Sequence, residues 1–238
     1  MSYVVTAYFT VGTPYEEHVK RLIRSMKRFN LTYDVTPIQP KGDWYANTQW
    51  KPHFVQEMLA KHFPKSVVYV DADAEFLKYP SLFDEYDERD DAYLAAHVLD
   101  HSRRRRKHVK PELLSGTLYF KNCATTHEII DRWIAECKPH PQLWDQVGLD
   151  RALKAGDYPY FILPEEYCTI FDYMADVEEP VIKHYQASRT VRNAPPPKKE
   201  IDKPDPVMVK PGSVKRHPAT SVRRGGVVRI GRKRRNML

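Results

Sequence analysis

The chain has little cysteine, and what it has does not form a recognisable site. Its three cysteines, Cys123, Cys137 and Cys168, are odd in number and lack the short paired spacing of a zinc ribbon or a disulfide framework. We therefore expect reduced thiols in a cytoplasmic protein, and we expect neither a structural zinc ion nor disulfide bonds.

Long apolar runs are also missing. The N-terminal residues MSYVVTAYF have no basic stretch ahead of a long apolar region, and no later segment approaches the 18 or so apolar residues that span a bilayer. No internal repeat is visible. We expect no targeting segment and no membrane span.

The composition is that of a globular protein. With 238 residues, of which 42% are hydrophobic, the chain can bury a full core as one domain or as one domain with an appendage. A soluble enzyme is compatible with these values.

The net charge of +7 is unevenly distributed. Residues 191–238 contain 14 of the 38 lysines and arginines but three of the 31 acids, so this part carries +11 and residues 1–190 carry −4. The segment begins with the proline-rich VRNAPPPKKEIDKPDP and ends with the highly charged VRRGGVVRIGRKRRNML. We predict a folded domain over residues 1–190, followed by an irregular, flexible basic tail over residues 191–238.

Within residues 1–190, apolar strand-like segments alternate with helical patterns, which favours an α/β layered fold. The first helix is predicted over residues 13–29, with Thr13 as N-cap, Glu16 completing a capping box, and one apolar face. A second helix is predicted to begin near Pro52, and two more over residues 126–137 and 145–154. Strands are expected at SYVVTAYF, TYDVTPIQ, SVVYV, AYLAAHV, GTLYFKN, YFILP and VIKHYQ.

Two aspartates follow the apolar strand in VVYVDADAEFL. Residues two apart on an extended segment point to the same side, so Asp71 and Asp73 can converge on one cation, and Ala72 between them keeps the approach narrow. Oxygen ligands favour Mg²⁺ or Mn²⁺. The alternative is a turn with two solvated acids, which is commoner for so short a motif. The position at the carboxyl end of a buried-type strand, where open α/β sheets bind ligands, favours the metal site.

Four segments in order give this sequence a resemblance to a known family. VVYVDADAEFL resembles the strand and D-x-D motif of the GT-A nucleotide-diphospho-sugar transferases, and LLSGTLYFKN, WDQVGLDRAL and IKHYQASR are similar to later segments of the same superfamily. The resemblance implies a GT-A, Rossmann-like fold with a mixed, mostly parallel central sheet flanked by helices. It also implies a glycosyltransferase that uses Mn²⁺ or Mg²⁺ and a nucleotide-diphosphate sugar, for which we expect a UDP-sugar.

The resemblance assigns roles to individual residues. It makes Asp73 catalytic through the metal, and it makes His184 a third metal ligand beside Asp71 and Asp73, although a histidine after a strand is otherwise an ordinary surface residue. The residues expected to contact the donor are Tyr8, Thr10, Lys51, Asp71, Ala72, Ser115, Gly116, Gln146, Ser188 and Arg189.

Several of these assignments have a structural alternative. Tyr8 is expected to contact the base, yet a core tyrosine fits equally well, and Lys51 can reach the diphosphate or simply be solvated. Asp145 can be a helix N-cap, or, if the enzyme inverts the anomeric centre, the base that removes the acceptor's proton. If the enzyme retains the configuration, no clear nucleophile stands out.

Two basic regions of the sequence suggest hypotheses about the acceptor. The run from Arg103 to Lys107 in DHSRRRRKHVK is expected in a loop near the site, and with the basic tail 191–238 it can follow a polyanion, so modified DNA or another polyanion is one acceptor hypothesis. Solubility, or attraction to an anionic lipid or glycan, also explains the charge.

Two rival functions remain at this stage. One is a nucleic-acid-binding protein, or a metal-dependent nuclease or nucleotidyltransferase, which needs further acids near the metal; the run DEYDERDD reads as a surface turn. The other is an inactive sugar-nucleotide fold that serves as an interaction module.

Overall fold

A computed structural model of the chain describes residues 3–104 and 109–192. The predicted tail over residues 191–238 lies outside the described residues except for its first two, and Arg105, Arg106 and Lys107 of the basic run lie outside them as well. None of the described helices combines the length and apolarity that crossing a bilayer requires.

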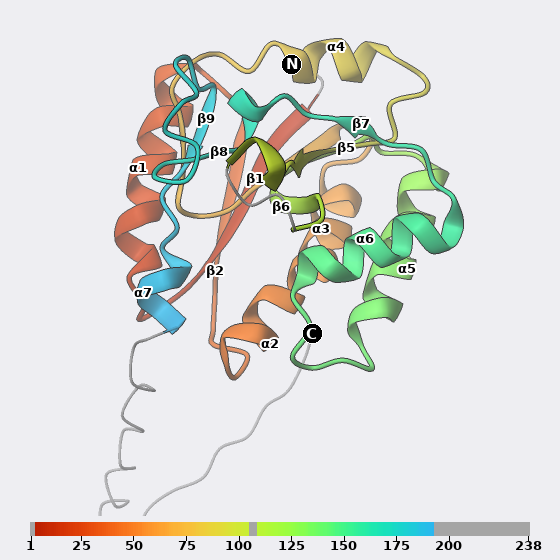
Figure 1. Cartoon of the computed structure of the whole chain (residues 1–238). Coiled ribbons are helices and arrows are strands. Elements are labelled where there is room, and N and C mark those ends of the chain that lie inside the picture. Colours follow the sequence, from red (N-terminus) through yellow and green to blue (C-terminus); the bar gives the residue numbers. More distant parts are fainter. Residues whose placement is uncertain (1–2, 105–108, 193–238) are drawn as a thin grey trace, which may run out of the picture. The chain divides into compact units, whose positions relative to one another are not determined.

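The core of the domain is a six-stranded mixed sheet, seen near edge-on among its helices in Figure 1. Its strands, in spatial order, are β2 (Tyr33–Ile38), β1 (Tyr3–Thr10), β3 (Ser66–Val70), β6 (Glu112–Phe120), β5 (Leu94–Leu99) and β7 (Phe161–Ile162). Strands β2, β1 and β3 are mutually parallel, as are β5 and β7, and β6 runs antiparallel to both of its neighbours. The predicted mixed, mostly parallel sheet is confirmed.

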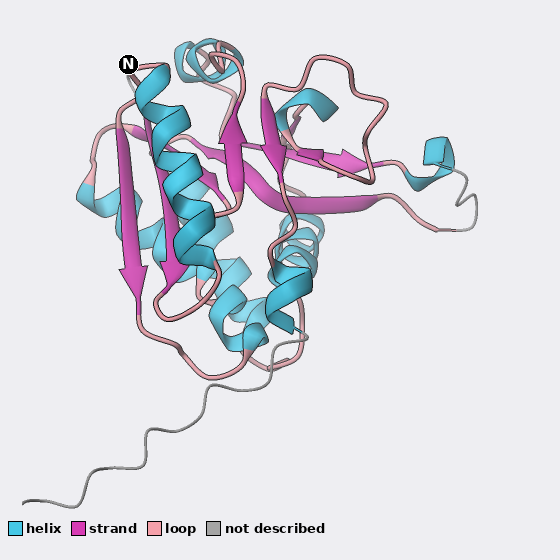
Figure 2. Cartoon of the chain, turned by 90° about the vertical axis from the view of Figure 1, so that its left-hand side faces the viewer, coloured by secondary structure: helices cyan, strands magenta, loops and turns pink. Residues whose placement is uncertain are grey.

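Helices cover both faces of this sheet. On one face lie α3 (Lys51–Lys61), α5 (Ala124–Cys137) and α6 (Asp145–Gly156). On the other lie α1 (Tyr15–Arg28) and α4 (Leu82–Glu88), and Figure 2 shows α1 in front of the strands. This arrangement explains why the strands read as continuous apolar runs.

The central strand β3 shows how the two layers form. Val67 and Tyr69 pack into the cluster under α3 and α5, whereas Val68 and Val70 pack into the cluster under α1. Because successive side chains of a strand point to opposite faces, the five residues of β3 contact both helical layers. The strand also brings the acids that follow it to the carboxyl end of the parallel strands.

A small second sheet follows directly after the D-x-D motif. It contains β4 (Ala74–Phe76), β9 (Ile182–His184) and β8 (Thr169–Ile170), with β4 antiparallel to β9. The register places Ala74 opposite His184. The chain after the D-x-D motif is thereby paired with the segment that carries the histidine.

The predicted capping box of the first helix is wrong. Helix α1 begins at Tyr15 after Pro14, and no side chain caps it. Thr13 instead donates its hydroxyl to the Thr10 carbonyl at 2.6 Å, and the Gly12 amide donates to Glu16 Oε1 at 2.8 Å. Both side chains are used to close the turn that leaves β1, where Gly12 has a positive φ of 71°. The predicted apolar face is confirmed, since Val19, Leu22 and Met26 are buried.

Short elements differ most from the sequence prediction. Helix α4 occupies most of the DEYDERDD segment that was expected to be a turn, because Phe83 and Tyr86 anchor it to the core. Helix α2 (Trp44–Gln49), which was not predicted, is capped by Asp43, whose side chain accepts the Ala46 amide at 2.8 Å. Helix α7 (Ser188–Arg192) and a 3₁₀ turn over His101–Arg104 complete the elements that surround the site.

Candidate active site

A cavity of about 400 Å³ opens at the carboxyl ends of β1 and β3. It is also lined by α2, by the N-terminal part of β6, and by the first residues of α6 and α7. Predicted site residues that line it are Tyr8, Thr10, Lys51, Asp71, Ala72, Asp73, Ser115, Asp145, Gln146, Ser188 and Arg189. Gly116 and His184 lie directly behind the two aspartates.

Three of these residues form a group with metal-ligand geometry. One atom from each of Asp71, Asp73 and His184 lies within 4.8 Å of the other two. Gly116 keeps the space open, because a Cβ there would lie 3.2 Å from His184 Cε1 and 3.4 Å from Asp71 Oδ2. Two carboxylates and an imidazole are a donor set that fits Mn²⁺ well and also admits Mg²⁺.

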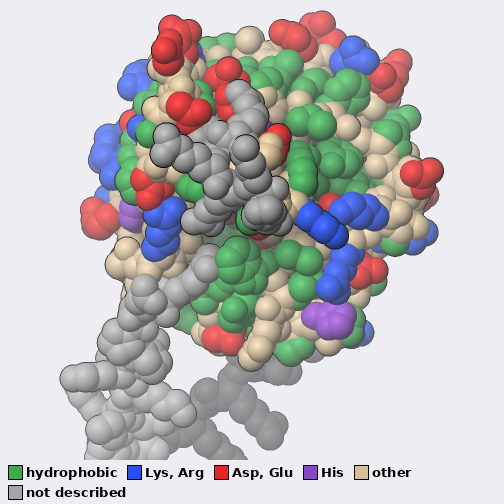
Figure 3. Space-filling model, viewed as in Figure 1, with side chains coloured by type: hydrophobic (Ala, Val, Ile, Leu, Met, Phe, Trp, Pro, Cys, Tyr) green, Lys and Arg blue, Asp and Glu red, His purple; other side chains and the backbone are tan. Residues whose placement is uncertain are grey.

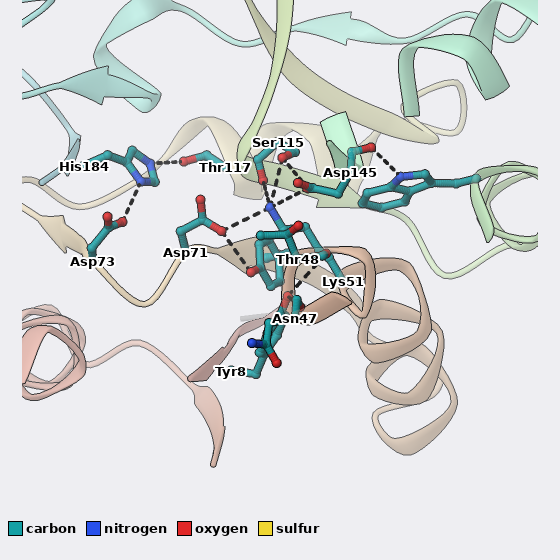
Figure 4. Close-up of polar contacts among 12 residues, drawn as sticks. Tyr8, Asn47, Thr48, Lys51, Asp71, Asp73, Ser115, Thr117, Asp145 and His184 are labelled. Atoms are coloured by element: carbon teal, nitrogen blue, oxygen red, sulfur yellow. Dashed lines mark hydrogen bonds and ion pairs between the residues drawn. The ribbon is translucent and has the colours of Figure 1, made fainter. Parts of the chain in front are cut away.

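Asp73 and His184 are held in fixed orientations (Figure 4). The Ala187 amide donates to Asp73 Oδ2 at 2.7 Å, and His184 Nδ1 lies 3.7 Å from Asp73 Oδ1. The other ring nitrogen, Nε2, is 2.8 Å from the Thr117 hydroxyl, so Nδ1 faces the carboxylates. Burial raises the pKa of Asp73, but His184 and the Ala187 amide outweigh that effect and hold the pKa below its ordinary value.

Asp71 is neutralised in a different way. Lys51, 3% exposed, places Nζ 3.1 Å from Asp71 Oδ1 and 2.8 Å from Asp145 Oδ2. The Tyr69 hydroxyl donates to the same Asp71 oxygen at 2.9 Å. Burial lowers the pKa of Lys51, but the two carboxylates raise it above its ordinary value, so the amine stays charged.

Asp145 is the first residue of α6 and does not cap the helix, since Trp144 holds the N-cap position without a side-chain hydrogen bond. Its side chain turns instead toward Lys51 and accepts the Ser115 hydroxyl at 2.6 Å, while Lys51 Nζ also donates to Ser115 Oγ at 2.9 Å. The N-cap alternative for Asp145 is therefore wrong. Figure 4 shows Lys51 at the centre of the contacts that join Asp71, Ser115 and Asp145.

Tyr8 and Thr10 lie where β1 reaches the cavity. The Tyr8 ring belongs to the core cluster, packs 5.1 Å from the Phe54 ring, and donates its hydroxyl to the Asn47 carbonyl at 2.8 Å. Tyr8 also lines the cavity. Tyr8 thus ties β1 to α2, and Thr10 is buried at the end of the strand.

Ser188 and Arg189, at the start of α7, border the cavity on the side of Asp73. The Arg189 guanidinium is bonded through both terminal nitrogens to the Asp172 carboxylate. This pair holds α7 to the loop after β8, and it engages the guanidinium that was expected to contact the donor.

Sequence reasoning missed four polar residues around the site. Thr117 orients His184, and its place two residues after Ser115 on one strand was a usable signal. Tyr69 contacts Asp71 in the same way, two residues before it. Glu112 and His101, which contact each other at 3.2 Å, are separated by a loop and carry no sequence signal.

An α/β sheet whose central strand delivers a D-x-D motif into a cavity, backed by a histidine from a late strand, defines a GT-A glycosyltransferase. The sequence profile of the nucleotide-diphospho-sugar transferase family matches residues 20–190, and the chain belongs to this family. The comparison with curated proteins gave no match.

Solved structures show the same fold. A glycosyltransferase involved in the glycosylation of the major capsid of PBCV-1 superposes with a TM-score of 0.58 at 13% identity, covering 77% of this chain and 92% of that one. The apo form of the glycosyltransferase GlyE from Streptococcus pneumoniae TIGR4 superposes with a TM-score of 0.50 at 18% identity, covering 76% of this chain and 54% of that one.

Proposed function

We propose that this glycosyltransferase binds a UDP-sugar with the help of Mn²⁺ or Mg²⁺ and transfers the sugar to an acceptor hydroxyl. The observation that carries the proposal is the Asp71, Asp73 and His184 group, which stands at the edge of a cavity large enough for a nucleotide sugar. The family membership supports the nucleotide-sugar donor.

Asp71, Asp73 and His184 would hold the cation. When bound there, a divalent cation supplies positive charge against the negative charge that builds up on the leaving diphosphate. The chain's own residues fix the ligands in advance, through the Thr117 contact to His184 and the Ala187 amide on Asp73. Preformed ligands lose little conformational entropy on binding.

Lys51 and its partners would form the wall that faces the transferred sugar. Ser115, Asp145 and Lys51 are buried and bonded to one another, and Gly116 follows Ser115 on the same strand without a side chain. We assign Ser115, Gly116, Asp145 and Gln146 to the sugar and the acceptor. Tyr8, Thr10, Ala72 and Ser188 would contact the nucleotide, and Arg189 would do so only after it leaves Asp172.

The base that removes the acceptor's proton, if the reaction needs one, was assigned to Asp145. Its Oδ2 accepts hydrogen bonds from both Lys51 Nζ and Ser115 Oγ, so this oxygen is already engaged by two donors within the protein. A role for Asp145 in holding Lys51 beside the sugar fits these contacts better than proton removal.

The nuclease or nucleotidyltransferase alternative has less support. Within residues 3–104 and 109–192, the group of Asp71, Asp73 and His184 is the one candidate metal cluster, so further acids do not converge on a second ion. Part of the DEYDERDD run lies on α4, which packs against the core through Phe83 and Tyr86.

The hypothesis of a DNA or other polyanionic acceptor rests on the basic run from Arg103 to Lys107 and on the tail, which fall largely outside the described residues. On the face shown in Figure 3, the described lysines and arginines are interspersed with acids.

The experiment that tests the proposed function is a thermal-shift screen of sugar nucleotides with and without Mn²⁺. A ligand that binds the folded state raises the melting temperature by mass action, so the donor should stabilise the protein, and it should do so more strongly with Mn²⁺. Calorimetry with UDP then measures the metal dependence directly. Binding of UDP that is equally tight with and without the metal would overturn the proposal.

A further inference from the structure

Glu112, at the start of β6, is a fourth carboxylate at the cavity, and it takes no part in the metal group or in the Lys51 contacts. Its side chain is 38% exposed and is held at both oxygens. Gln146 Nε2 donates to Oε1, and His101 Nε2 lies 3.2 Å from Oε2. His101 is itself buried, with Nδ1 2.8 Å from the Tyr173 hydroxyl. The carboxylate is therefore fixed in direction but still open to the cavity.

The hydrogen-bonding capacity of Glu112 is only partly used. An ionised carboxylate accepts about four hydrogen bonds and donates none, and each oxygen here has one partner from the protein. Asp71 and Asp145 differ, because both contact Lys51. Among the described residues, Glu112 contacts no lysine or arginine, so the described part of the chain leaves the remaining acceptor positions of this carboxylate for a ligand or for water.

The charge of the cavity limits what that ligand can be. Of the described residues that line it, four are acids and two are lysine or arginine, namely Lys51 and Arg189, and both cations are already bonded to carboxylates. A phosphate group brought to Glu112 would meet like charge. A neutral molecule rich in hydroxyl groups would find acceptors without that repulsion.

The lining next to Glu112 is apolar. Leu99 and Leu114 belong to a small cluster that Tyr173 packs against, and all three line the cavity. A sugar ring has apolar C–H faces and hydroxyl edges, so it matches an apolar wall beside a fixed carboxylate.

Building on the proposed function, we propose that Glu112, held by Gln146 and His101, forms the acceptor subsite and that this subsite takes a neutral sugar residue. The carboxylate accepts hydrogen bonds from the acceptor's hydroxyl groups, and the wall of Leu99, Leu114 and Tyr173 contacts its ring. Glu112 is bonded to Gln146, and the residue before Gln146 is Asp145, which contacts Lys51. The acceptor would therefore lie near the sugar that is transferred.

The test measures release of nucleoside diphosphate from the donor found in the thermal-shift screen, with Mn²⁺ and the full chain. The acceptors are neutral disaccharides and, in parallel, an oligonucleotide with hydroxymethylated bases. Disaccharides should stimulate release with little dependence on salt. Glu112→Gln should raise the disaccharide KM about tenfold or more, because a charge-assisted hydrogen bond is lost. Donor hydrolysis without acceptor and the shift in melting temperature caused by donor are measured in parallel, and both should change less than the disaccharide KM.

Two further variants separate binding from folding. Glu112→Asp keeps the charge and should recover part of the affinity for the disaccharide. The matched control is Glu128→Gln on α5, where the glutamate accepts the Tyr158 hydroxyl at 3.2 Å outside the cavity, and its kinetics should equal those of the unaltered chain.

The outcomes are distinguishable. If donor neither binds nor is hydrolysed by the unaltered chain, the proposed function fails. If donor turnover is intact but only the oligonucleotide stimulates it, or no disaccharide does, or Glu112→Gln leaves the acceptor KM unchanged, the acceptor subsite is overturned and the function stands.

Discussion

Two groups of carboxylates face the same cavity, and the chain neutralises them in different ways. Asp71 and Asp145 share a built-in cation, the buried amine of Lys51. Asp73 has no lysine or arginine among the described residues; it is held by the Ala187 amide and lies beside His184. The charges of the first group are balanced within the protein, whereas under the proposed function the second group receives a cation from solution.

The difference changes how the D-x-D motif is understood. From the sequence, Asp71 and Asp73 are expected to converge on one ion, with the catalytic role assigned to Asp73. In the structure, Oδ1 of Asp71 is bonded to Tyr69 and Lys51 while Oδ2 faces Gly116 and the metal group. Asp71 thus connects the two groups, so under the proposed function a bound metal and Lys51 would contact the same carboxylate.

Removing the charge from the metal group should produce the largest effect. Asp73→Asn should lower sugar transfer and donor hydrolysis on the order of 10³-fold, about 4 kcal/mol, because the leaving diphosphate loses its main electrostatic stabilisation. Steady-state kinetics with Mn²⁺ measures the loss, and circular dichroism checks the fold. Asp131→Asn, at an exposed acid on α5 bonded to Gln56, is the control. A fully active Asp73→Asn enzyme would rule out metal-assisted catalysis.

Removing the built-in cation should mainly cost stability. Lys51→Met keeps the shape of the side chain but leaves Asp71 and Asp145 close together without a cation, which should cost about 3–5 kcal/mol. Urea-induced unfolding at pH 7 measures the free energy. Adding Asp145→Asn should restore part of it, because one of the two carboxylates is then neutral.

The control for this prediction is Lys20→Met, which breaks the exposed contact of Lys20 with Glu17 at 2.6 Å and should leave the unfolding midpoint unchanged. Should Lys51→Met unfold at the same urea concentration as the unaltered chain, Asp71 and Asp145 would have to be neutralised by something other than Lys51.

Much of the fold could be predicted because its signals are local. The apolar runs of β1 and β3 and the apolar face of α1 follow from hydrophobic periodicity, and burial on both faces made the strands easy to find. The short strands β4 and β8 could not be found, since two or three residues become a strand only by pairing with β9. The error at Thr13 has a similar cause, because its hydroxyl is drawn to the Thr10 carbonyl rather than to the helix.

In the candidate site, too, the features with a local sequence signal could be predicted, and those that depend on tertiary packing could not. The approach of Asp71 and Asp73 was predictable from their spacing, but the predicted extended segment is wrong. Strand β3 ends at Val70, and the Ala74 amide donates to the Asp71 carbonyl at 2.9 Å, so the two aspartates lie in a turn. The approach of His184 came from family resemblance, since nothing local links a residue of β9 to β3. The contact between Lys51 and Asp145 depends on the packing of α3 against α5 and β3 and of α6 against α5 and β6. The pairing of Arg189 with Asp172 depends on a loop, so neither contact could be predicted.

Loosening the metal group without removing a ligand should have an intermediate effect. Thr117→Val keeps the volume at β6 but removes the hydrogen bond to His184 Nε2, so the ring loses its fixed orientation. Metal affinity should fall about 10- to 100-fold, as for other residues that orient metal-bound histidines. Titration calorimetry with Mn²⁺ measures it. The control is Thr48→Val on α2, whose hydroxyl donates to the Tyr45 carbonyl. Equal Mn²⁺ affinity in Thr117→Val and the unaltered chain would mean that His184 is not a ligand.

The smallest effect on stability is expected at Asp34, a carboxylate near the surface that contacts two basic side chains. Asp34 on β2 lies 2.7 Å from both Lys61 Nζ and His62 Nε2. Burial by itself raises the pKa of Asp34, but Lys61 and His62 outweigh it and the pKa is lowered. A carboxylate with a lowered pKa stabilises the fold at pH values above its unfolded pKa, and this contribution is lost as the pH falls through the folded value.

Asp34→Asn should therefore destabilise the protein at pH 7 by about 0.5 kcal/mol, because solvent screens a pair whose lysine is more than half exposed. Urea-induced unfolding at a series of pH values measures the difference, which should disappear as the pH falls well below 4 because Asp34 is then protonated in both states. Glu17→Gln, at a fully exposed acid whose contact with Lys20 is screened by solvent, should show a smaller difference than Asp34→Asn at every pH. The prediction is wrong if Asp34→Asn loses as much free energy of unfolding at pH 7 as Lys51→Met, or if its loss persists in acid. Either result would mean that burial does not explain the difference between Asp34 and the carboxylates of the cavity.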